Sequence, residues 1–377
     1  MNTLPHPSLG LTLVAFICVL GPVVFFHELG HYLMARLFRI PAETFSIGFG
    51  SELAGWTDKQ GTRWKIAWLP LGGYVKFVGD MGPASDPADL ETIPEHLRDR
   101  AFQLRPVWQR FLVVLAGPMA NFLLAIVIFA AFFTLIGAPQ SNIVGAVEPN
   151  SAAQVAGLQP GDRILSVAGR GTSTFEDIRS VVLIRPNETV TLKVGRGQSV
   201  RDLGVTLRSE ETNDLLGRPM KKGVLGVSPT TTVLQPVPVT RAVPMAADYT
   251  INMVGTMVDG LVQIVRGQIS PKQLGGPITI ARVAGEGAQL GLFSFIGFLA
   301  LLSINLGFIN LLPVPLMDGG HLFFYAIEAV RRRPLSARAH DWAFRGGFAF
   351  LLALMVFLTI NDLGSLGLWD RLQRLIG

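Results

Sequence analysis

The sequence is poor in cysteine and in charged residues. It has one cysteine among 377 residues, so it can form no internal disulfide bond and no metal site built from cysteine thiolates. Only 16% of the residues are charged and 49% are hydrophobic, whereas about a quarter of an ordinary soluble domain is charged. This composition excludes an ordinary soluble protein, yet it has too many charges for membrane spans alone. We therefore expect a membrane protein that carries one soluble domain.

The sequence also lacks lysine and arginine ahead of its first apolar run, which extends from Leu9 to Phe38. A cleavable signal peptide needs a basic N-terminal region, so we expect this run to be retained as a membrane span. Basic residues outnumber acidic ones by 32 to 27, giving a net charge of +5. In a membrane protein this excess is typical of cytoplasmic loops, and we predict no nucleic-acid partner.

Apolar runs long enough to cross a bilayer occur four times, at 9–38, 107–136, 292–316 and 346–360. Arginines follow the first run, and five more lie between the third and fourth runs. Because basic loops stay in the cytoplasm, both termini are predicted to be periplasmic. Residues 243–265 are moderately apolar but contain Asp248, Asn252 and Asp259, and they are predicted to form an amphipathic helix instead of a span.

The predicted fold class is therefore a polytopic α-helical membrane protein with four transmembrane helices and one inserted periplasmic α+β domain. Its parts are an N-terminal membrane half, the inserted domain, a linker with an amphipathic helix and a Gly-Pro loop, and a C-terminal membrane half. In that order they cover residues 1–140, 141–210, 211–291 and 292–377.

The sequence His27-Glu28-Leu29-Gly30-His31 lies inside the first apolar run. Residues four apart on a helix share a face, so His27 and His31 can both face one metal ion. Zn²⁺ binds neutral imidazole readily, and Glu28 lies where a general base for the attacking water is needed. Ionisable groups at membrane depth are costly, and by default they are functional. The alternative is two unrelated histidines in a membrane helix.

A catalytic zinc usually has three protein ligands, and the third candidate here is Asp318. It is the only acidic residue between Glu286 and Glu328. Pro313 and Pro315 precede it and must break the helix of the third run. Irregular backbone at membrane depth is tolerated only where it lines a cavity or is buried in protein, so this break favours a site.

Topology supports the same choice, because the first and third runs both cross from outside to inside. His27 and Asp318 then lie at similar depths, nearer the cytoplasmic face. His321 is a rival ligand, but an unpaired carboxylate needs a cation more than an imidazole does. The other interpretation of His321 is a hydrogen-bonded structural histidine.

Residues 62–68 and 74–78 alternate like strands, and residues 69–73 join them. They are predicted to form a membrane-associated β-hairpin with a free edge beside the first span. Asn310, ahead of the broken segment, could orient a substrate carbonyl or stabilise an oxyanion. Asn121, in the second run, needs a polar partner, and either a packing role or a direct role near the metal fits it.

Residues 142–208 are soluble in character and lie outside the cytoplasm if the first two runs cross the membrane. Short β-like runs alternate with turns, and a helix is predicted to begin with Ser151 as its cap and to end at Gly157.

Together these motifs resemble the site-2 protease family of intramembrane zinc metalloproteases, most closely its bacterial regulator-of-sigma-E branch. The residues that carry the resemblance are His27 to His31, Gly72 to Val75, Gly117-Pro118 with Asn121, Gly276-Pro277, and Asn310 through Gly319. Residues 142–208 also resemble a bacterial PDZ domain, most clearly at Pro160-Gly161-Asp162-Arg163-Ile164.

The resemblance implies that three residues, His27, His31 and Asp318, bind one Zn²⁺ ion and that Glu28 is the base. It implies substrate contacts at Asn310, at Asn121 and along Gly72, Gly73, Tyr74 and Val75. A transmembrane helix must unwind before it is hydrolysed, and an open sheet edge can accept the extended strand. The sequence departs from the family pattern in having Met317 where leucine is usual, and one recognisable PDZ domain where the best-known relatives have two.

The expected function is that of a zinc endopeptidase in the bacterial inner membrane. Its substrates would be single-span membrane proteins, such as anti-sigma factors or signal-peptide remnants, and a C-terminal peptide could bind the PDZ-like domain. One alternative is a non-catalytic membrane PDZ adaptor, which the retained Glu28 and the full ligand set disfavour. Another is a transporter with a midplane ion site, which the absence of inverted repeats disfavours.

Overall fold

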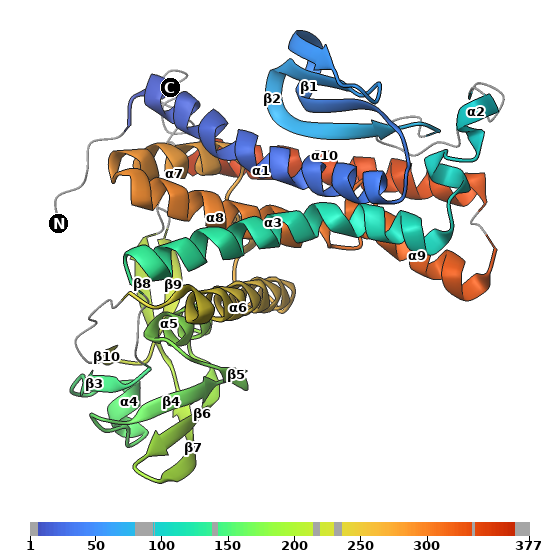
Figure 1. Ribbon diagram of the computed structural model, residues 1–377. Coiled ribbons are helices and arrows are strands. Elements are labelled where there is room, and N and C mark those ends of the chain that lie inside the picture. Colours follow the sequence, from blue (N-terminus) through green and yellow to red (C-terminus); the bar gives the residue numbers. More distant parts are fainter. Residues whose placement is uncertain are drawn as a thin grey trace, which may run out of the picture. The chain divides into compact units, whose positions relative to one another are not determined.

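The long apolar helices of the computed structural model follow the apolar runs of the sequence (Figure 1). The structure describes residues 7–79, 93, 95–137, 142–213, 219–229, 236–333 and 336–365. Within these ranges, four helices are long and apolar enough to cross a membrane: Leu9–Leu37 (α1), Val107–Leu135 (α3), Leu292–Asn310 (α8), and His340–Gly364 of α10 (Ala337–Ser365). The four predicted spans are thus confirmed as helices. The predicted locations of the termini concern residues outside the described ranges.

The chain forms two compact units, of which unit 1 combines Met1–Ile128 with Gly276–Thr359. The side chain of Ser8 caps α1 by accepting a hydrogen bond from the Leu11 amide, and Pro22 lies within the helix. Helix α7 (Pro277–Gln289) begins within the predicted Gly-Pro loop, at Pro277, with Gly276 as its N-cap. Helices α1, α7 and α8 pack together around small and apolar side chains that include Ala15, Val19 and Ala284.

Two further helical pieces of unit 1 precede the second span in the chain, namely α2 (Glu95–Arg98) and the 3₁₀ turn η2 (Phe102–Leu104). After the third span comes α9 (Asp318–Arg331), which starts on Asp318 itself. The core beneath the sheet described next contains aromatic and branched residues of α1, α3 and α9, among them Tyr32, Val113 and Leu322.

Two long, bent strands, β1 (Ala42–Thr57) and β2 (Arg63–Phe77), form an antiparallel sheet in contact with α1. The start of β1 pairs on both sides, because Phe45 has Val75 as its partner on one side and Trp64 on the other. The end of β1 pairs with the start of β2. The segments therefore lie in the order 52–57, 63–67, 44–47 and 73–77, which leaves residues 73–77 at one edge.

This arrangement corrects the predicted hairpin. Residues 62–68 and 74–78 do not pair with each other, since the start of β1 lies between them. The prediction missed β1 because Gly48 and Gly50, both with positive φ, interrupt its alternation of side chains. The edge beside the first span is nevertheless present, and it is formed by residues 73–77.

Unit 2 combines Phe129–Gly275 with Ile360–Gly377 and contains a strand-rich domain, defined here as residues 142–229. One sheet has the order β5-β4-β6-β7, and two-stranded pairs join β10 with β3 and β8 with β9. The strands are β3 (Val144–Val147), β4 (Arg163–Val167), β5 (Arg170–Gly171), β6 (Thr189–Arg196), β7 (Ser199–Thr206), β8 (Arg208–Asn213), β9 (Pro219–Val224) and β10 (Val227–Pro229).

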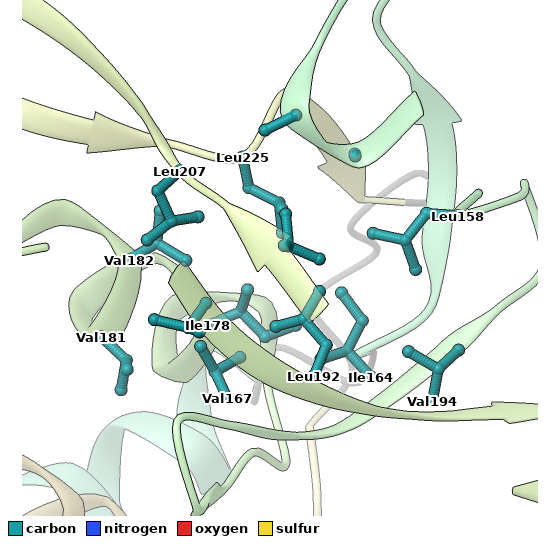
Figure 2. Packing of buried hydrophobic residues seen from close by; sticks show 14 of the residues in the cluster. Leu158, Ile164, Val167, Ile178, Val181, Val182, Leu192, Val194, Leu207 and Leu225 are labelled. Carbon is teal, nitrogen blue, oxygen red and sulfur yellow. The ribbon is translucent and has the colours of Figure 1, made fainter. Parts of the chain in front are cut away.

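The core of the strand-rich domain lies between these strands and helix α5 (Phe175–Leu183) (Figure 2). Ile164, Ile178 and Leu192 are almost fully buried in it. Leu225 belongs to the same core and β10 pairs with β3, so the domain uses residues beyond the predicted boundary at 210. The predicted capped helix is α4 (Ala152–Val155), with the Ser151 side chain accepting from the Gln154 amide.

The segment that follows the strand-rich domain contains α6 (Val239–Val265) and the 3₁₀ turn η3 (Pro271–Gln273). Helix α6 covers the predicted amphipathic segment and is not among the four candidate spans. It contacts the strand-rich domain through Asp259, which forms ion pairs with Arg170 and Arg185.

Candidate active site

Helix α1 places the two motif histidines one above the other on a single face. Their imidazole rings lie edge to face with centroids 4.8 Å apart, and their Nε2 atoms are 3.3 Å apart. His27, Glu28 and His31 have exposed fractions of only 7%, 8% and 9%. Three ionisable side chains are therefore withdrawn from solvent along one turn of an apolar helix. Their burial is energetically costly, which points to a shared function.

Asp318 reaches this face from the first position of α9, directly after the broken segment that follows α8. Helix α8 ends at Asn310, ahead of the two prolines, and Leu316 has a positive φ of 78°. Gly320 is needed here because a Cβ on it would lie 2.8 Å from the Cα of Pro315. The chain thus folds tightly back, and Oδ2 of Asp318 lies 3.1 Å from Nε2 of His27 and 3.5 Å from Nε2 of His31.

These three side chains fit a metal ion. One ligand atom from each of His27, His31 and Asp318 lies within 4.8 Å of the other two. The Asp318 Oδ2 atom is buried and has no hydrogen-bond partner, as expected of a carboxylate oxygen that is shaped to bind a cation. Two imidazoles and a carboxylate are the donor set of many catalytic zinc sites, where zinc acts as a Lewis acid. His321 lines the same cavity but is not part of the cluster.

The histidine rings are oriented by polar groups of α3. Nδ1 of His31 lies 2.9 Å from the Val113 carbonyl oxygen and must donate to it, which leaves Nε2 free as a ligand. Nδ1 of His27 lies 3.3 Å from the Asn121 amide, whose buried oxygen otherwise has no partner. An Asn121 amide turned so that this oxygen accepts from Nδ1 satisfies both groups and again leaves Nε2 for the metal.

The remaining candidate residues border a cavity of about 630 Å³ that the three candidate ligands also line. The Asn310 amide nitrogen lies 3.2 Å from Nε2 of His27, so its side chain lies beside the candidate ligand atoms. Gly73, at the sheet edge, is so close to α1 that a Cβ would lie 3.1 Å from Cγ of Glu28. The backbone amide of Val75 also faces the Glu28 carboxylate. The edge of β2 and the predicted base therefore border the same cavity.

The model of the family described as "Peptidase family M50" matches residues 15–354. This chain belongs to peptidase family M50. As an M50 peptidase it is a zinc metalloprotease, which confirms the resemblance to site-2 proteases and zinc as its cofactor.

Relatives of this M50 peptidase match it along nearly their whole length. A protein of Rhizobium meliloti (strain 1021), provisionally named a zinc metalloprotease, is 43% identical over 366 residues, or 95% of this chain and 98% of that protein. A protein of Agrobacterium fabrum with the same provisional designation is 42% identical over 385 residues, or 97% and 100%. The metalloprotease MmpA of Caulobacter vibrioides is 39% identical over 380 residues, or 94% and 95%.

The structure brings together every candidate site residue that the sequence indicates. Glu28, Asn310 and residues 72–75 line the cavity with the three candidate ligands, whereas Asn121 contacts His27 from behind. Sequence reasoning missed the Val113 carbonyl, because a backbone acceptor leaves no signal in side-chain identity. It also left the role of Gly117 open, which the structure places directly against His31.

Proposed function

We propose that this M50 peptidase hydrolyses peptide bonds within or near the transmembrane segments of single-span membrane proteins. His27, His31 and Asp318 would hold the zinc ion, and Glu28 would be the general base. The observation that carries this proposal is the position of Glu28: it is buried beside the metal cluster in a cavity bordered by a strand edge. A buried carboxylate in a membrane helix destabilises the protein, so by default it has a function.

Glu28 would take a proton from the attacking water and return it to the leaving amine. Asn310 is suited to orient the scissile carbonyl, because its amide donates toward the position where the ligand atoms converge. Zinc, when bound, supplies Lewis-acid stabilisation of the developing negative charge. The Asn121 amide would act behind His27 by holding its ring, and so would affect substrate only indirectly.

The edge of β2 would bind the substrate as an added strand. A helix cannot be hydrolysed until its backbone is extended, and main-chain hydrogen bonds to residues 73–77 would hold it extended. Among the described residues no strand pairs with the outer side of this segment. The sheet would also associate with the membrane, since Trp56 and Trp68 are 59% and 66% exposed and such side chains favour membrane interfaces.

The strand-rich domain would be a PDZ-like module that binds an extended C-terminal peptide. Support comes from strand β10, which pairs only with β3 among the described residues and follows a turn at Gly226. A peptide could add to its other side by strand addition. We further propose a bacterial inner-membrane location with this domain in the periplasm and the metal site nearer the cytoplasm. Candidate substrates are anti-sigma factors and signal-peptide remnants.

The test of the proposed function uses single-span reporter proteins, with wild-type and variant peptidase purified in detergent. Glu28→Gln removes only proton transfer, so it should keep zinc at wild-type stoichiometry and lose turnover by about a hundredfold or more. His27→Ala should lose zinc and activity together. Glu211→Gln, at an exposed position of β8, is the matched control and should behave as wild type. Full cleavage by the Glu28→Gln protein would overturn the assignment.

The wild-type and Glu28→Gln proteins also distinguish a protease from a non-catalytic PDZ adaptor. An adaptor would bind reporter C-termini equally well in the wild-type and Glu28→Gln proteins and would cut none of them. Comparison of membrane-protein fragments from cells that carry either form would then show no difference.

A further inference from the structure

The carboxylate of Asp58 joins three parts of unit 1. Asp58 lies in the turn between β1 and β2, and its Oδ1 accepts from the amides of Gln60 and Thr62 at 2.8 and 3.0 Å. Its Oδ2 accepts from the Tyr32 hydroxyl on α1 and from Nε1 of Trp64 on β2, both at 3.1 Å. One carboxylate thus ties the turn to the helix that carries the metal motif.

The helix side of this contact is held firmly. Tyr32 is 6% exposed, and its hydroxyl accepts from Nη1 of Arg36 at 3.0 Å while donating to Asp58. Tyr32 follows His31 directly and lies one helical turn after Glu28. The point where Asp58 contacts α1 is therefore at a constant distance along the helix from Glu28, the proposed base.

The sheet side of the contact leads to the substrate edge. Trp64, Phe45 and Val75 are partners in one row across three strand segments. The Trp64 and Phe45 rings are stacked at 4.2 Å, and both rings also pack edge-on against Tyr32. Neighbouring strands lie about 4.8 Å apart, so Val75 is about 10 Å from Trp64 in a hydrogen-bonded sheet with little freedom to shift.

Val75 lies at the far end of this row, where its amide faces the Glu28 carboxylate. The row therefore approaches α1 at both ends, but side-chain hydrogen bonds to an α1 residue away from the active site hold only the Trp64 end. The hydrogen-bonded group of Asp58, Tyr32 and Trp64 forms that end of the row. The other end is the edge that would receive the substrate, and no described strand lies beyond it to hold it in place.

We propose that Asp58 is a positioning residue of the peptidase, which through Tyr32 and Trp64 sets the distance between the substrate-binding edge of β2 and Glu28. This inference rests on the proposed function, in which residues 73–77 bind the substrate strand. Loss of the contact leaves the metal ligands in place and lets the edge move relative to the base. An error of about 1 Å in such an alignment can lower a rate about a hundredfold.

Three variants separate this role from mere turn formation. Tyr32→Phe and Trp64→Phe each remove one hydrogen bond to Oδ2 and keep the aromatic packing and both amide bonds of the turn. Asp58→Asn keeps an acceptor for the turn amides and weakens the contacts to both side chains. Lys59→Ala, at an exposed position of the same turn, is the matched control.

The experiment measures zinc content, KM and kcat on a single-span reporter, and cross-linking between the edge and that reporter. Cross-linking uses Lys76→Cys on β2 and a cysteine near the reporter's cleavage site, in a Cys18→Ser background that also carries Glu28→Gln. We expect kcat to fall about tenfold to a hundredfold and cross-linking to fall in all three variants, with zinc unchanged. The double variant Tyr32→Phe/Trp64→Phe should be no worse than Asp58→Asn, because the effects act through one carboxylate.

Wild-type kcat and cross-linking in the three variants would overturn the proposal, as would a parallel loss of zinc and kcat. Cross-linking does not need turnover, so it decides the role of Asp58 by itself. Failure of the wild-type protein to cut any reporter would therefore count against the proposed function and leave the positioning test intact.

Discussion

Gly117 on α3 lies directly against the imidazole of His31 on α1. A Cβ on residue 117 would overlap Nε2 of His31, the ring atom that faces the metal position, and would lie 2.9 Å from its Cδ2. Gly30 similarly allows the two helices to meet, since a Cβ there would lie 2.8 Å from the Cβ of Ala120. Small residues at this helix crossing therefore make the space that the ligand geometry requires.

We expect Gly117→Ala to displace His31 and lower zinc affinity about tenfold to a hundredfold, the range typical of a lost ligand orientation. Activity should fall with zinc, while the protein stays folded because alanine favours a helix more than glycine does. Gly21→Ala on α1 is the control, because a Cβ on this residue would have no neighbouring atom within 4 Å. Zinc titration of the Gly117→Ala and Gly21→Ala proteins measures this effect. Equal zinc affinities in the two variants would contradict the steric argument.

If residues 73–77 of β2 bind the substrate strand, proline and threonine at residue 75 should have different effects on the cleavage rate. Val75→Pro removes the amide that faces Glu28 and cannot donate to a bound strand, so cleavage should fall about tenfold or more. Val75→Thr keeps the strand backbone and should change the rate much less. Zinc content should stay near wild type in both, because the three proposed metal ligands lie on other elements. Equal initial rates for the two variants would mean that this edge is only structural.

The membrane topology can be tested with reporter fusions. Fusions at residues 85 and 334, which lie outside the described residues, should report the cytoplasm, and a fusion at Arg170 should report the periplasm. The arginines that follow α1 and α9 support this orientation. A cytoplasmic signal at Arg170 would contradict the proposed orientation and the proposed depth of the active site.

The strand-rich domain should lose stability at acidic pH through Asp162. Burial alone would raise the pKa of this carboxyl, but paired hydrogen bonds from Arg196 at 2.7 Å and one from the Gln159 amide outweigh it and lower the pKa. A lowered pKa stabilises the folded state above the unfolded value of about 3.9. That contribution is lost as pH falls through the still lower folded pKa.

Hydrogen exchange of the full-length protein, followed in peptides that cover residues 158–196, measures this effect. Wild-type protection should be equal at pH 7 and pH 5 and should weaken near pH 3. Asp162→Asn should reduce protection about tenfold at pH 7 and remove most of the pH dependence. Asp202→Asn, at an exposed position of β7, is the control. The same acid-induced loss in Asp162→Asn and in wild type would assign the effect to other groups.

The four spans and the paired histidines could be predicted because they depend on local pattern. A long apolar run has to form a helix in a bilayer, and residues four apart on that helix share a face wherever it packs. Pro313 and Pro315 likewise mark the end of α8 without reference to any other part of the chain. The strand pairing was predicted wrongly, because the bends of β1 at Gly48 and Gly50 hide its alternation, and pairing depends on which segments meet.

By itself, the sequence determined the apolar helices and the shared face of His27 and His31, because helix periodicity is set by the backbone. Only the tertiary structure decided that Asp318 lies 3.1 Å from His27, that Asn121 and Val113 orient the two rings, and that the β2 edge borders Glu28. These distances join residues far apart in the chain. They depend on how closely helices and strands can pack, which small residues such as Gly73 and Gly117 permit through three-dimensional contacts that no local pattern contains.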